Sequence, residues 1–141
     1  MRASARAILI TKNNKLMLMK RTKPDRLYYV TIGGGIEENE TSEQALLREL
    51  KEESGSIVEQ PIFAFHYDDF EMQNSVDFFI CKELSRVKPT GAEWTDWNTP
   101  DNQYKLVELS ADEARNVPLK PDALKDKIIS IYENFVMKNS K

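Results

Sequence analysis

The sequence predicts an α/β protein in which a mixed β-sheet is covered by helices on two faces. Three observations support this prediction: strand-like apolar runs in both halves of the chain, a glycine-rich turn that leads from a strand into a well-capped helix, and an amphipathic helix near the end. A chain of 141 residues is long enough for one compact domain, which would bury about two-thirds of the surface of its unfolded form. We therefore expect a single domain over residues 1–141.

The composition is that of a soluble globular protein, with 40% hydrophobic and 30% charged residues. No apolar run approaches the roughly 20 residues that span a bilayer, and the first residues lead directly into a strand pattern. We therefore expect a cytoplasmic protein that does not bind a membrane. A net charge of -3 argues against a broad nucleic-acid surface. The only cysteine, Cys81, lies in an apolar run and is expected to be a buried, inert thiol.

The first third of the chain is expected to be β-structure. Two apolar runs, residues 6–11 and 15–21, flank a short polar segment whose asparagines tolerate the left-handed backbone of a tight turn. This pattern predicts an antiparallel hairpin. A basic loop over residues 21–26 should follow, and then a β-branched and aromatic strand over residues 27–32 that stops at Gly33.

A helix is predicted to begin after Thr41. The Thr41 hydroxyl can cap the first turn, and Gln44 stands where its side chain completes a capping box. Gly55 supplies the left-handed exit after Ser54.

The second half should continue the sheet and end in helices. In order, we expect strands over residues 57–67 and 75–84, a long loop over residues 85–103, a strand over residues 104–109, and helices that begin near Ser110 and Pro121. The last helix carries an apolar stripe at helical spacing, formed by Leu124, Ile128, Ile131 or Tyr132, and Phe135.

Glutamates crowd the central helix. On an α-helix, Glu49, Glu52 and Glu53 fall within an arc of about 100° beside the apolar stripe. Like charges four residues apart repel, and a divalent cation would remove that penalty. Carboxylate oxygens at this density suit Mg²⁺ or Mn²⁺. Taken alone, the cluster slightly favours a solvated helix face relieved by Arg48 and Lys51 over a metal site.

The full spacing of the segment decides between these interpretations. From Gly34, five residues lead to Glu40, and seven more lead to Arg48-Glu49-Leu50, followed by Glu52, Glu53 and Gly55. The segment over residues 34–56 resembles the Nudix box, Gly-x5-Glu-x7-Arg-Glu-aliphatic-x-Glu-Glu-x-Gly-aliphatic, and it matches eight of the nine fixed positions. The departure is Ser56, where the family prefers an aliphatic residue, and we expect Ile57 to supply that packing.

The resemblance implies a Nudix-type α/β/α sandwich with a mixed β-sheet and a hydrolase activity. Members of this family cleave the pyrophosphate bond of a nucleoside diphosphate linked to another moiety, such as a nucleoside triphosphate, a nucleotide sugar or ADP-ribose, by water attack on phosphorus with Mg²⁺ or Mn²⁺. The implied catalytic residues are Glu49, Glu52, Glu53 and Arg48. The three glutamates match the metal ligands, Gly33 matches a glycine whose carbonyl binds the cation, and Arg48 matches the arginine that fixes the glutamates, with Glu40 in a supporting position.

Residues outside the box complete the predicted site less specifically. Asp101, just before the last strand, is our candidate for a further metal-binding carboxylate, and its rivals are Glu93, Asp68, Asp69 and Asp77. Arg6, Arg21 and Arg26 are candidates to bind phosphate, and Tyr28 is a candidate to face a nucleobase. The lone His66 is expected to be a hydrogen-bonded structural residue.

A second class of function stays open, because some proteins of this fold bind nucleotides or partners without catalysis. An intact set of acidic box residues favours the enzyme. The expected partner is a small nucleotide-type diphosphate, not an extended nucleic acid or a membrane, and the protein should be a monomer or a homodimer.

Overall fold

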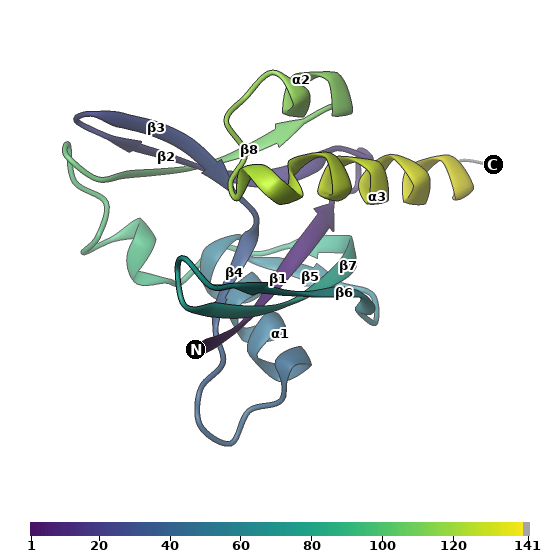
Figure 1. Ribbon diagram of the computed structural model, residues 1–141, viewed down its shortest axis with the longest axis horizontal. Helices are drawn as coiled ribbons and strands as arrows, with labels where there is room; N and C mark the ends of the chain where they lie inside the picture. Colours follow the sequence, from purple (N-terminus) through teal and green to yellow (C-terminus); the bar gives the residue numbers. More distant parts are fainter. Residues whose placement is uncertain (140–141) are drawn as a thin grey trace.

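The computed structural model describes residues 1–139, in which eight strands form one sheet between helices (Figure 1). The strands are β1 (Arg2–Ile10), β2 (Leu16–Lys23), β3 (Arg26–Val30), β4 (Ile32–Gly35), β5 (Ser56–Val58), β6 (Ile62–Asp69), β7 (Asn74–Arg86) and β8 (Gln103–Leu109). The helices are α1 (Ser42–Glu53), α2 (Ala111–Arg115) and α3 (Lys125–Lys138), with 3-10 turns η1 (Ala92–Trp94) and η2 (Asp122–Leu124).

The sheet is mixed, as the sequence predicts. Its main order is β3-β2-β1-β7-β5, with β4 paired to β1, β6 to β7 and β8 to β2. The central strands β1 and β7 are parallel, and the other pairs are antiparallel. Helix α1 covers one face of this sheet, and α3 with α2 covers the other (Figure 1).

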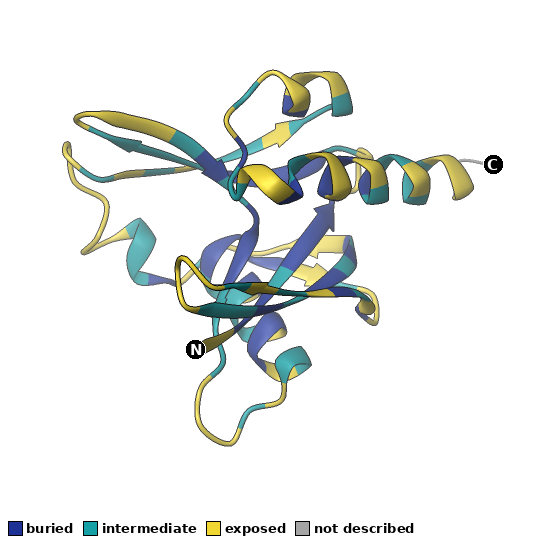
Figure 2. Ribbon diagram, viewed as in Figure 1, coloured by how far each residue is buried: buried dark blue, intermediate teal, exposed yellow. Residues whose placement is uncertain are grey.

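Strand β1 lies at the centre of two hydrophobic cores. Successive side chains of a strand point to opposite faces. Ile8 and Ile10 therefore pack in the cluster under α3, while Ala7 and Leu9 pack in the cluster under α1. The fully buried strand residues lie in the middle of the molecule (Figure 2). This three-layer arrangement is the predicted α/β/α sandwich.

The opening hairpin is confirmed, and the segment after it differs from the prediction. Asn14 adopts a φ of 60° in the turn, as a tight hairpin requires. The predicted basic loop over residues 21–26 is mostly the end of β2 and the start of β3. The strand prediction also ended too early, because Ile32–Gly35 form β4. Gly33 lies so close to β1 that a Cβ there would collide with the Ala5 carbonyl, so this pairing requires glycine.

Helix α1 begins and ends as the sequence predicts. The Thr41 hydroxyl accepts a hydrogen bond from the Gln44 amide, and the Gln44 side chain accepts one from the Thr41 amide, which completes the capping box. Gly55 leaves the helix with a φ of 70°.

The expected packing by Ile57 is wrong, because Ile57 is 45% exposed and Ser56 is the buried residue. The Ser56 hydroxyl donates a 2.7 Å hydrogen bond to Glu83, whose side chain is also buried and pairs with Arg86. A buried carboxylate needs donors, and an aliphatic side chain supplies none. Burial by itself would raise the pKa of Glu83, but hydrogen bonds from Arg86 and Ser56 bring it below its ordinary value.

The C-terminal helices and the cysteine also follow the predictions. Ser110 caps α2 with a second capping box. Leu124 of η2 and Ile128 and Tyr132 of α3 are buried in the core beneath the helix, as is Ile129, which the predicted stripe omitted. Cys81 is buried, and burial raises the pKa of its thiol to about 12. Within residues 1–139, no helix is both long enough and apolar enough to cross a membrane.

Candidate active site

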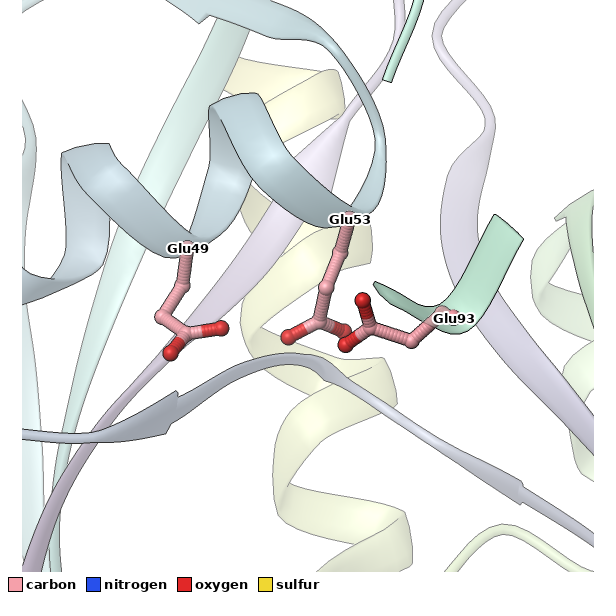
Figure 3. Close-up of side chains that lie close together, drawn as sticks. All are labelled: Glu49, Glu53 and Glu93. Carbon is pink, nitrogen blue, oxygen red and sulfur yellow. The ribbon is translucent and has the colours of Figure 1, made fainter. Parts of the chain in front are cut away.

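Three carboxylates from two separate segments meet at the end of α1. Glu49 and Glu53 project from the last turns of α1, and Glu93 comes from η1 in the loop between β7 and β8. One oxygen from each of the three lies within 4.8 Å of the others. In Figure 3 the carboxylate of Glu53 lies between those of Glu49 and Glu93. Hard oxygen donors in this arrangement fit a divalent cation such as Mg²⁺ or Mn²⁺.

Nearby arginines compensate this concentration of negative charge only in part. Glu53 is only 7% exposed, and its pKa is raised well above the ordinary value by burial and by its contact with Glu49, against the opposing charge of Arg6. The pKa of Glu52, which is more exposed, is also raised, first by desolvation and then by the charge of Glu49. These surroundings therefore disfavour full ionisation of the two carboxyl groups, and a bound cation would favour it.

Arg48 holds the glutamate-bearing helix against the loop that precedes it. Its guanidinium donates a bidentate pair of hydrogen bonds to Glu40, at 2.7 and 2.9 Å, and one of 2.9 Å to Glu49. A further bond of 3.0 Å reaches the carbonyl of Gly35. The hydrogen bonds from Arg48 lower the pKa of Glu40 to about 2. Arg48 does not line the cavity that opens over the carboxylates, so in this arrangement it orients Glu49 and not a ligand.

Glycines let the carboxylates approach the sheet. A Cβ at Gly34 would lie 2.7 Å from the Glu49 carboxylate, so only glycine allows Glu49 to rest against β4. Gly33, predicted to offer a carbonyl to the cation, lines the same cavity as the glutamates.

A cavity of about 610 Å³ opens over the carboxylate cluster. Its other walls carry cationic and aromatic side chains, namely Arg2, Arg6, Arg21, Trp97 and Tyr104. Arg6 donates to the carbonyl of Thr31, and burial lowers its pKa while the charges of Glu53 and Glu49 raise it. A cavity with acids on one wall and arginines on another suits a phosphate bound together with a metal ion.

Arg21 is held between protein groups at the edge of this cavity. Its guanidinium lies 3.8 Å from the centre of the Tyr104 ring and hydrogen-bonds Asn102. Its buried Nε has no hydrogen-bond partner within residues 1–139.

A second cavity of about 410 Å³ adjoins the first and shares Arg6 and Val30 with it. It is lined by the predicted substrate residues Arg26 and Tyr28, and the Arg26 guanidinium lies 4.3 Å from the centre of the Tyr28 ring. The four side chains predicted to bind substrate therefore divide between the cavities: Arg21 in the first, Arg26 and Tyr28 in the second, and Arg6 in both.

Asp101 does not join the carboxylate cluster, and its rival Glu93 lies there instead. Asp101 is exposed in the turn before β8. Two rivals, Asp68 on β6 and Asp77 on β7, form hydrogen bonds with His66 on β6. His66 is therefore a hydrogen-bonded residue, as expected. Asp69 lines the second cavity.

Two residues that line the first cavity, Arg2 and Tyr104, were not predicted from the sequence. Both sit in strand patterns without a motif. Glu93 was among the rivals to Asp101, but no sequence pattern distinguishes it from the other rivals.

Comparisons with known proteins address the family and the fold. The family described as the NUDIX domain matches residues 1–126. No curated protein has a sequence that matches this chain.

Solved structures resemble the chain in fold at low sequence identity. A structure from work on MutT of Aliivibrio salmonicida and Vibrio cholerae has a TM-score of 0.67 at 20% identity, covering 92% of this chain and 97% of its own. A NUDIX hydrolase from Nitrosomonas europaea has a TM-score of 0.69 at 16% identity, covering 95% and 89%. An ADP-ribose pyrophosphatase from Streptococcus suis has a TM-score of 0.65 at 18% identity, covering 95% and 91%.

Proposed function

This chain belongs to the Nudix family, and from this premise we propose that it is a pyrophosphohydrolase that cleaves the pyrophosphate bond of a nucleoside diphosphate linked to another moiety, with Mg²⁺ or Mn²⁺ as cofactor. The observation that supports this proposal most directly is the meeting of Glu49, Glu53 and Glu93 under a cavity that also presents arginines. Acids alone would repel a diphosphate, and arginines alone would bind it without activating water.

In this proposal Glu49, Glu53 and Glu93 hold the metal, with Glu52 at the more exposed side and the carbonyl of Gly33 available as a further oxygen. The chemistry supplied by a divalent ion at such a site is a lowered pKa of water and neutralisation of charge on the phosphate oxygens. Arg48 keeps Glu49 oriented through its bonds to Glu40 and Gly35.

The arginines have the complementary task of binding and orienting the substrate. Arg6 lies where the two cavities join, so we assign it to the diphosphate itself. Arg21 and Arg2 line the same cavity and would neutralise the remaining phosphate charge. The group attached to the diphosphate would then occupy the second cavity, against Arg26 and Tyr28.

A substrate panel tests this function. Purified protein would be incubated with ADP-ribose, a nucleotide sugar, oxidised nucleoside triphosphates and a dinucleoside polyphosphate, with Mg²⁺ and Mn²⁺ in parallel. We expect hydrolysis of at least one compound, its loss in excess EDTA and its return when metal is added. Full turnover in excess EDTA would rule out the metal site.

The same experiment separates the enzyme from a binding module of the same fold. Ligand binding without any hydrolysis across the panel would support the non-catalytic alternative. Metal should also raise the melting temperature, because a ligand that binds only the folded form stabilises it by mass action. An unchanged melting temperature at saturating metal would count against a preformed site.

A further inference from the structure

The loop that carries Glu93 is attached to the last turn of the helix that carries the other two carboxylates. The amide of Gly91 donates a 2.8 Å hydrogen bond to the carbonyl of Glu52. The indole Nε1 of Trp94 donates a 2.8 Å hydrogen bond to the carbonyl of Glu53. Further along, the amide of Val87 donates a 2.8 Å hydrogen bond to the carbonyl of Gly55.

These bonds answer a general need of helix ends. The last four carbonyls of an α-helix have no partner within the helix. In α1 the loop supplies the donors for Glu52 and Glu53, so the position of the loop depends on the end of the helix. Of these donors, only Trp94 provides a side chain, and its ring also packs against the core cluster under α1. The indole is thereby held at both its polar and its apolar parts.

Glu93 stands directly before this indole. A Cβ at Gly91 would collide with a carboxylate oxygen of Glu93, so the side chain of Glu93 folds back closely over Gly91. On its other side it meets Glu53, whose backbone carbonyl receives the indole hydrogen. One residue, Glu53, therefore contacts the loop twice, through its carboxylate beside Glu93 and through its carbonyl at Trp94.

We propose that Trp94 is a positioning residue for metal binding, whose hydrogen bond to the Glu53 carbonyl sets Glu93 at the distance needed to complete the cluster on α1. This inference rests on the proposed metal site. Without the indole bond, η1 keeps its apolar packing and the bond from the Gly91 amide to Glu52, but it loses its hydrogen bond to the Glu53 carbonyl. Glu93 then has to be ordered when the metal binds, and the cost appears as weaker metal affinity.

The test measures the affinity for Mn²⁺ alone, without substrate, by isothermal titration calorimetry. Trp94→Phe keeps a packed ring and removes the donor. We expect about threefold to tenfold weaker binding, the scale of one neutral hydrogen bond. The matched control is Tyr132→Phe, which removes a 2.6 Å bond from an aromatic side chain to the carbonyl of Asn14 on the opposite face of the sheet. Tyr132→Phe should lower the melting temperature by about as much as Trp94→Phe does, but it should leave the affinity for Mn²⁺ unchanged.

A double-mutant cycle with Glu93→Gln tests whether Trp94 acts through Glu93. In the Glu93→Gln background, Trp94→Phe should change Mn²⁺ affinity by less than about twofold. An equal loss in both backgrounds would mean that Trp94 acts on α1 directly and would overturn the proposal. Unchanged affinity in Trp94→Phe, with normal binding by the parent, would also overturn it. If the parent binds no Mn²⁺, the proposed metal site fails and the positioning role fails with it.

Discussion

Replacement of Glu53 by glutamine is the most discriminating change in the proposed site, because it keeps the shape of the side chain and removes its charge. Glu53 is almost fully buried and lies between two other carboxylates. We expect Glu53→Gln to lower kcat by at least about a hundredfold, the scale on which charge stabilisation or proton transfer contributes to catalysis.

The metal-free stability should move in the opposite direction. The pKa of Glu53 is raised by burial and by Glu49, so the metal-free protein disfavours the ionised side chain. Two carboxylates four residues apart cost a few tenths of a kcal/mol on an exposed helix and more where water is excluded. In a domain of this size, 1 kcal/mol corresponds to about 3 °C. Relief of this repulsion should therefore raise the melting temperature in EDTA by about 1 °C or more.

The assay compares turnover on a substrate found in the panel with thermal unfolding in EDTA. Glu43→Gln is the matched control, because Glu43 lies on the same helix, contacts Gln60 and does not line the cavity. It should keep turnover within twofold of the parent. If Glu53→Gln also keeps turnover within twofold, or if it lowers the metal-free melting temperature by several degrees, Glu53 is a structural residue and the reasoning is refuted.

Two further predictions concern residues outside the cluster. Ser56→Val, which restores the aliphatic residue of the box, should lower the free energy of unfolding by about 1 to 3 kcal/mol, because buried Glu83 loses a donor; unchanged urea unfolding would contradict this. The pKa of His66 is raised by hydrogen bonds to Asp77 and Asp68, so its stabilising effect should be complete below about pH 6.5 and lost as pH rises through the raised pKa. The difference in melting temperature between the parent and His66→Gln should therefore shrink as pH rises from 6 to about 8, and a constant difference would show that these bonds do not favour the protonated ring.

Features that depend on nearby residues were predictable from the sequence alone. The capping box of Thr41 and Gln44 and the left-handed exit at Gly55 involve groups only a few residues apart, and the structure has both. The spacing of Glu49 and Glu53 determines that both carboxylates project from the same side of one helix. For the same reason, the box spacing was sufficient to identify the family, which the match over residues 1–126 confirms.

Only the tertiary structure decided what meets these local features from far along the chain. Glu93, and not Asp101, joins the cluster because the loop before β8 docks on the end of α1, and no local pattern encodes that contact. Likewise, Gly33 continues a strand because β1 lies beside it, although glycines in isolation indicate a turn. Ser56 is buried because Glu83, on the paired strand β7 but far along the sequence, requires its hydroxyl. Strand pairing and loop docking depend on the free energy of the whole fold. A sequence pattern can therefore propose candidate carboxylates outside the box, but it cannot decide which of them reaches Glu49 and Glu53.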